Sequence, residues 1–217
     1  MLDVFHIAKP QGCDIQTFYG SGGVSTIVKN VWNKPRGVSH VYILMIGAGG
    51  NGDNASAGGG SGAVTVWYGA AQNVPDILFP IPGRGQGEDT RLGFKGSSGT
   101  IVAVLTAGSG AASGTAGAAG TANYFAASGF YQSIAGQNGA GASQTASTTT
   151  FLSGGSSGTT TANYGYSTTT DGYFQLQPII VGVGGGGAAT GKRAGFGCGG
   201  SLNSSTGGPG MILIASW

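Results

Sequence analysis

The sequence predicts an all-β protein with a β-sandwich or jelly-roll-like core and long glycine-rich loops. Short segments rich in β-branched and aromatic residues recur along the chain, and glycine or proline follows nearly every one of them. Good helix formers other than alanine are scarce, and Glu88 is the single glutamate. This pattern is typical of antiparallel sheets that pack on each other.

Four segments have the strongest strand character, because they are apolar, β-branched and bounded by glycine. They are residues 38–46, 63–68, 101–105 and 211–217. Trp217 closes the last segment, and we expect this strand to lie inside a sheet, because its loss would expose an edge and open the core. Weaker strand candidates are residues 24–31, 76–81, 90–94, 173–176 and 179–183.

We expect a single domain over residues 1–217, with a β core at about 15–106 and 173–217. A loop insertion of alanine, glycine, serine and threonine occupies about residues 107–172. No charged residue occurs between Lys95 and Asp171. A loop region of this length inside a compact domain is either functional or disordered.

Aromatic residues interrupt this neutral insertion and are the candidate surface-contact residues. Aromatic rings in an uncharged surrounding suit contacts with sugars or with another protein surface. They can equally fasten long loops to the core, and the sequence leaves both roles open. The six residues are Tyr124, Phe125, Phe130, Tyr131, Tyr164 and Tyr166.

Glycine occupies 47 of the 217 positions, against a usual level of about 7 %. Disorder normally combines low hydrophobicity with high net charge, whereas this chain has a slightly positive mean hydropathy and a formal net charge of +2. Polyglycine segments can also pack closely as extended, polyproline-II-like rods. Because strong strands flank most of the glycine, we interpret it as ordered connection and surface.

Several partner classes are excluded by the same numbers. A net charge of +2 does not supply a basic surface for nucleic acid. The longest apolar run, residues 41–46, is far too short to cross a membrane, and the first residues do not form a secretory signal.

Cys13 and Cys198 lack a metal-type spacing. They could bridge the two ends of the chain or remain a reduced pair inside a cell.

Two glycine-rich motifs match phosphate-binding loops, and neither has the required context. Residues 47–52 fit G-x-G-x-x-G after a strand, but the residues that follow do not start a helix. Residues 186–192 fit G-x-x-x-x-G-K, but Arg193 stands where a P-loop needs serine or threonine. We therefore expect no nucleotide and no other cofactor.

No combination of residues indicates catalysis, so we expect the protein not to be an enzyme. His6 and His40 are the only histidines, so the base and the orienting acid that a serine nucleophile needs are scarce. Glu88 and Asp89 indicate a solvated turn with too few oxygen ligands for calcium. A glycoside hydrolase needs two acidic residues about 5 to 9.5 Å apart, and only Glu88, Asp89 and Asp171 are near the loops.

The first part of the core resembles a known group of proteins. Trp32, Pro35 and Gly37 form a Trp-x-x-Pro-x-Gly element that enters the strand 41–46, and this strand ends in the glycine-rich loop 47–52. The same order is similar to that of the glycine-rich proteins of aquatic bacteriophages and related viruses.

Two further segments are similar to the same viral proteins. Residues 75–85 contain Pro-Asp-Ile-Leu followed by Pro-Gly-Arg-Gly, and residues 207–214 resemble the closing strand. The resemblance covers roughly residues 15–105 and 178–217, and the insertion between them lies outside it.

The resemblance implies a virion structural protein, made in the host cytoplasm, that assembles with itself and with other virion proteins. A homotrimer is one possible assembly, and no catalytic residue carries over. The leading hypothesis is a fibre or spike subunit whose neutral, aromatic-bearing loops contact a glycan or protein of the host surface. The alternative is a capsid shell or vertex subunit whose loops are buried between subunits.

Overall fold

The computed structural model describes residues 14–20, 30–52, 58–85, 87–112, 117–123, 128–136, 138–139, 173–176, 179–182, 196–200 and 206–217. Regular structure in this part of the chain is almost entirely β-strand, with one short 3-10 turn, η2 (Ala71–Asn73). The all-β prediction is confirmed. No helix among these residues is long and apolar enough to cross a membrane.

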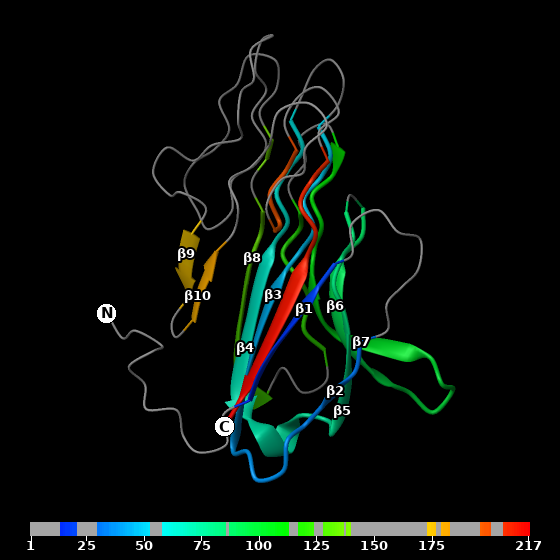
Figure 1. The fold of residues 1–217 in the computed structure, drawn as a ribbon. Coiled ribbons are helices and arrows are strands. Elements are labelled where there is room, and N and C mark those ends of the chain that lie inside the picture. The colour runs from blue at the N-terminus through cyan, green and yellow to red at the C-terminus, as the bar shows by residue number, and fades with distance from the viewer. Residues whose placement is uncertain are drawn as a thin grey trace.

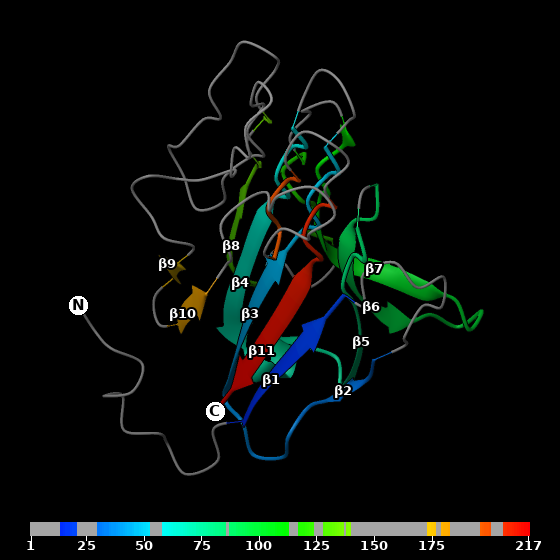
Figure 2. The same cartoon turned by 45° about the horizontal axis from the view of Figure 1, so that its top comes forward.

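A five-stranded antiparallel sheet forms one layer of the molecule, with the strand order β1-β11-β3-β4-β8. Figure 2 shows these strands side by side. The last strand of the chain lies between β1 and β3, so the prediction that it is buried inside a sheet is confirmed. The strands are β1 (Asp14–Tyr19), β11 (Met211–Ser216), β3 (His40–Ile46), β4 (Val64–Ala70) and β8 (Gly129–Ile134).

A four-stranded antiparallel sheet, with the order β2-β5-β6-β7, forms the second layer. Three of its strands are consecutive neighbours, which makes them a meander, and the jelly-roll topology stays a prediction. The strands are β2 (Trp32–Asn33), β5 (Ile77–Ile81), β6 (Thr90–Lys95) and β7 (Ile101–Ala107). A separate antiparallel pair consists of β9 (Tyr173–Leu176) and β10 (Ile179–Gly182).

The two sheets enclose a common apolar core. Side chains alternate between the two faces of a strand, so Val41, Ile43 and Met45 of β3 all belong to this core. Residues of the four-stranded sheet pack against them, and the largest is the fully buried Trp32. Other core residues are Trp67, Leu78, Leu92, Val104, Leu105, Ile212 and Ile214.

The outer face of the five-stranded sheet is apolar as well. Tyr42, Leu44 and Ile46 alternate with the core residues of β3 and belong to a second buried cluster. Met211, Leu213 and Ala215 on β11 are part of the same cluster. Burial on both faces explains why these two strands are continuous apolar runs in the sequence.

The predicted loop insertion 107–172 is only partly loop. β8 lies inside it and pairs with β4 along six residues. Its sequence, GFYQSI, has weak alternation and is flanked by small residues, so it gives little strand signal. Residues 141–172 lie outside the described residues, and so does most of the predicted strand 24–31.

Candidate functional site

At one end of the sandwich, strands of both sheets continue into extended, glycine-rich segments. β3, β7 and β8 lead into such segments, and β4 and β11 follow from them. The segments lie together above the sandwich in Figure 1, and none of their residues is charged. We call this region the glycine bundle, and it comprises residues 47–52, 58–63, 108–112, 117–120, 135–136, 138–139, 196–200 and 206–210.

Segment 58–63 is completely buried in the bundle and forms backbone hydrogen bonds with four neighbouring segments. Segment 117–120 contributes one bond, from Gly117 to Ser61. Each of the other three contributes two bonds whose residues are spaced by three, whereas pairing along an antiparallel β-ladder repeats every two. Three residues per turn is the repeat of the polyproline-II helix, whose amides all point outward. The hydrogen bonds, at 2.8–3.1 Å, run from Gly47 to Ala63, Gly50 to Gly60, Gly60 to Ala111, Ala63 to Gly108, Gly59 to Gly200 and Gly62 to Gly197.

Close approach of the backbones explains why these segments contain glycine. A Cβ atom on Gly62 would overlap the carbonyl group of Gly47, and one on Gly50 would overlap the backbone of Ala111. Both obstacles are backbone atoms, which cannot rotate away as the end of a side chain can. The high glycine content is therefore a packing requirement of the bundle.

The bundle also uses the first of the two phosphate-loop motifs, residues 47–52. The amides of Gly47, Gly49 and Gly50 donate to the carbonyl oxygens of Ala63, Gly208 and Gly60, each at 2.8 Å. A phosphate-binding loop needs backbone amides that are free to donate to the phosphate, whereas these three already donate to carbonyl oxygens of the bundle. This motif therefore contributes to packing, while the second motif, residues 186–192, lies outside the described residues.

Two of the six candidate contact residues, Phe130 and Tyr131, lie within the described residues and are neighbours on β8. Phe130 lies on the outer face of the sheet and is 59 % exposed. Tyr131 packs against the core, and its hydroxyl donates to the carbonyl oxygen of Gly120 at 2.6 Å. Tyr131 thus fastens the bundle to the sheet, which is the second role that the sequence left open. Tyr124, Phe125, Tyr164 and Tyr166 lie outside the described residues.

Phe130 belongs to a row of aromatic rings that forms on the outer face of the five-stranded sheet. It pairs in register with Tyr68 on β4. The Tyr68 ring stacks with that of His40 at a centroid distance of 5.6 Å and with that of Trp217 at 5.9 Å, and the planes are within 20° of parallel. We call Phe130, Tyr68, His40 and Trp217 the aromatic row. The sequence signal for the aromatic row is the presence of aromatic residues at outward-facing positions of neighbouring strands. This signal can be recognised only when the order of the strands in the sheet is known.

The remaining candidate residues do not come together as a metal site in the described part of the chain. No three His, Cys, Asp or Glu side chains come together there in a way that could hold a metal ion. His40 is part of the aromatic row, with Nδ1 2.9 Å from the Ser39 hydroxyl. Cys198 is buried in the bundle, whereas Cys13 and Asp171 lie outside the described residues.

Fold and site together define an antiparallel β-sandwich extended at one end by a bundle of polyproline-II-like segments. Comparison with models of known protein families and with curated proteins finds no match.

Proposed function

We propose that this chain is a virion structural protein, a fibre or spike subunit that presents its bundle end to the host surface. The glycine bundle is the observation that supports this proposal. The bundle is uncharged and held by backbone hydrogen bonds, and its inner segments 47–50, 58–63, 197–200 and 207–210 are buried. Such a bundle gives a firm base for the loop segments that connect to it. Gly139, at which a Cβ would overlap the carbonyl oxygen of Gly58 in the bundle, precedes the uncharged stretch of residues 140–170.

The opposite end of the sandwich suits attachment to other virion proteins or to further copies of the chain, including a trimer. Lys34, Arg36 and Asp76 lie there, whereas the bundle segments themselves carry no charge. Lys34 forms an ion pair with Asp76 at 2.8 Å and donates to the carbonyl oxygens of Ala71 and Val74. Exposed Arg36 lies in the adjacent turn.

A capsid shell or vertex subunit is the second candidate, and exposed apolar side chains favour it. Ile15 and Tyr19 on the edge strand β1 are 46 % and 55 % exposed, and the aromatic row reaches the other edge of the same sheet. Contacts between subunits would remove this apolar surface from water.

A deletion confined to residues 142–170 tests the fibre or spike proposal. It removes Tyr164 and Tyr166 but no residue of a described strand or of the bundle. We expect the variant to fold and assemble like the intact protein, and to lose adsorption to those aquatic bacteria that bind the fluorescently labelled intact protein. A full-length variant with Tyr164→Ala and Tyr166→Ala separates the two rings from the rest of the loop.

Two results would contradict this proposal. Undiminished adsorption of the deletion variant would show that the loop does not contact the host. Closed shells or rings of purified protein, seen by electron microscopy, together with no adsorption of the intact protein, would favour the capsid alternative.

A further inference from the structure

A cavity of about 250 Å³ lies beside the base of the glycine bundle, where the end of β1 meets the turn between β5 and β6. Its walls include Gly20 and Gly83, and both connect to the bundle through Gly210. Gly20 donates to the carbonyl oxygen of Gly210 at 3.0 Å, and Gly210 donates to that of Gly83 at 2.7 Å. The cavity is therefore held by the same backbone network as the bundle.

Charged side chains converge on this cavity in a chain that has few of them. The whole sequence contains nine basic and seven acidic residues, and Arg84, Glu88, Asp89 and Arg91 all line the cavity. A small number of convergent polar groups in a concave site is typical of ligand recognition. The two positive and two negative charges balance, so the site as a whole is neutral.

Arg84 and Glu88 form a two-pronged pair. Arg84 Nε donates to Glu88 Oε2 at 2.7 Å, and Nη2 donates to Oε1. The backbone amide of Arg84 also donates to Oε2, at 3.2 Å. The side-chain hydrogen bond lowers the pKa of Glu88 and raises the pKa of Arg84. Both groups are therefore charged at neutral pH and fixed in position before any ligand arrives.

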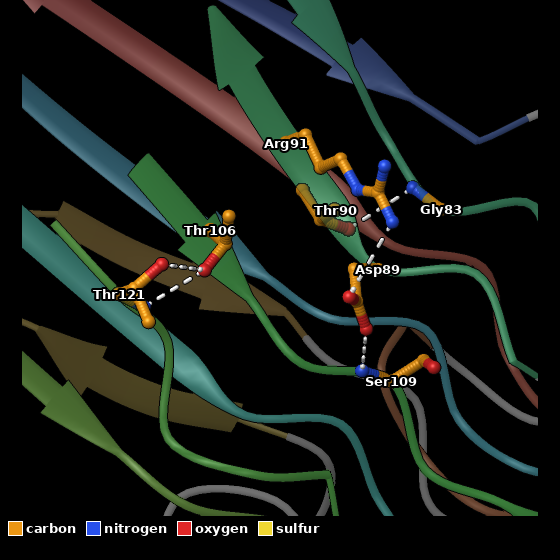
Figure 3. Close-up of polar contacts among 7 residues, drawn as sticks. All are labelled: Gly83, Asp89, Thr90, Arg91, Thr106, Ser109 and Thr121. Carbon is orange, nitrogen blue, oxygen red and sulfur yellow. Dashed lines mark hydrogen bonds and ion pairs between the residues drawn. The ribbon is translucent and has the colours of Figure 1, made fainter. Parts of the chain in front are cut away.

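Asp89 and Arg91 form the other side of the charged cluster, and Figure 3 shows their side chains directed at each other. Arg91 Nη2 lies 3.7 Å from Asp89 Oδ2. Asp89 Oδ1 accepts the backbone amide of Ser109, a residue of the bundle, at 3.0 Å. The bundle thus positions this carboxylate, while the Arg91 side chain is 56 % exposed and can turn its remaining donors to a ligand.

An apolar wall stands beside the charges. Tyr19, Ile81 and Pro82 line the cavity. The Tyr19 ring stacks on Phe196 at a centroid distance of 5.0 Å, which restrains it, and it stays 55 % exposed. An aromatic ring next to hydrogen-bonding groups suits a ligand with both C–H and hydroxyl surfaces.

We infer that this cavity binds one neutral, hydroxyl-rich sugar residue. Two carboxylates repel an anion and two guanidinium groups repel a cation, whereas a hydroxyl can donate to Asp89 and accept from Arg91. Cavities for drug-sized ligands span about 300 to 1,000 Å³, so this smaller one suits a molecule the size of a single sugar ring. The inference does not depend on the proposed function, because none of the residues that line the cavity belongs to residues 142–170.

Titration of the full-length protein with D-glucose, D-galactose, D-mannose and N-acetyl-D-glucosamine, followed by saturation-transfer NMR and calorimetry, tests the inference. We expect at least one sugar to bind, and Arg91→Gln to weaken its affinity about tenfold or more, because it removes a charged hydrogen-bond donor. Lys95→Gln is the matched control: Lys95 is also exposed and on β6, and the change removes the same charge outside the cavity. Both variants should unfold like the intact protein.

Several outcomes would overturn the inference. These are no binding of any of the four sugars, equal affinity in Arg91→Gln, or binding of inorganic phosphate in place of sugar. Adsorption to cells without sugar binding would overturn the cavity inference alone. Sugar binding that persists in a protein that adsorbs to no cells would support the cavity and contradict the attachment function.

Discussion

The hydroxyl of Thr90, at the start of β6, donates a hydrogen bond to the carbonyl oxygen of Ile46, at the end of β3, at 2.7 Å. This bond joins the two sheets at the level where the glycine bundle begins. The same hydroxyl accepts the backbone amide of Gly83 at 3.0 Å (Figure 3). Thr90 is fully buried, so water cannot replace it as a partner for either backbone group.

Thr90→Val should therefore lower the free energy of unfolding by about 1–3 kcal/mol, because valine has the same shape but leaves two buried backbone groups without their partner. Thr106→Val provides the comparison. The Thr106 hydroxyl bonds Thr121 at 3.0 Å in an exposed position, where water can take over, so the loss should be smaller. Urea unfolding of both variants measures the difference, and equal losses would contradict the bridging role of Thr90.

Gly62→Ala should destabilise the protein by about 1–3 kcal/mol or more, the range for overpacking a filled interior. Its Cβ would overlap the carbonyl oxygen of Gly47 inside the bundle. Gly85→Ala is the matched control, because a Cβ there meets no atom within 4 Å. Thermal unfolding compares the two, and a Gly62→Ala protein as stable as Gly85→Ala would show that the bundle is not tightly packed.

Much of the sandwich follows from the sequence because its central strands are buried on both faces. Residues 41–46 and 211–215 are uninterrupted apolar runs, and the structure places them side by side in one sheet. β8 was missed because an edge strand needs no such run. In the structure, the side chains of GFYQSI alternate between the two faces of the sheet, with Phe130 exposed and Tyr131 packed against the core. The sequence alone does not show this alternation, because both residues are aromatic.

The candidate site was harder to predict, for reasons of geometry. The high glycine content indicates ordered, closely packed segments. The three-residue spacing of their hydrogen bonds could not be predicted, because it depends on which segments lie next to each other in the fold. Segment 58–63 bonds residues as distant in the chain as Gly200. Likewise Arg84 and Arg91 are too far from Tyr19 in sequence for any local pattern to show that they share a cavity.

Tyr42→Phe should remove a specific pH dependence of stability. Burial raises the pKa of Tyr42 to about 12, and its hydroxyl has no hydrogen-bond partner among the described residues. Because the unfolded phenol ionises near pH 10, the folded state holds the proton more tightly between these values. The contribution of the protonated Tyr42 phenol to the free energy of unfolding is thus fully present below about pH 10. It falls by about 2–3 kcal/mol as the pH rises to about 12.

The measurement is the unfolding free energy of wild type and Tyr42→Phe across that alkaline range. Other groups titrate there too, so only the difference between the two proteins is diagnostic. Near neutral pH the variant should be at least as stable as wild type, because it removes a buried polar atom without a partner. Parallel stability curves for the two proteins would contradict the assignment.

Phe130→Ala and Tyr131→Phe should have different effects on adsorption and on stability, although the two residues are adjacent on β8. Phe130 is 59 % exposed, so its loss should change stability by less than about 0.5 kcal/mol. Tyr131→Phe removes only the hydroxyl that bonds Gly120, and should cost about 0.5–1.5 kcal/mol. If the aromatic row contacts the host, Phe130→Ala should weaken adsorption and Tyr131→Phe should not. The reverse pattern would mean that the outer face of the sheet serves the fold and that binding depends on the bundle end alone.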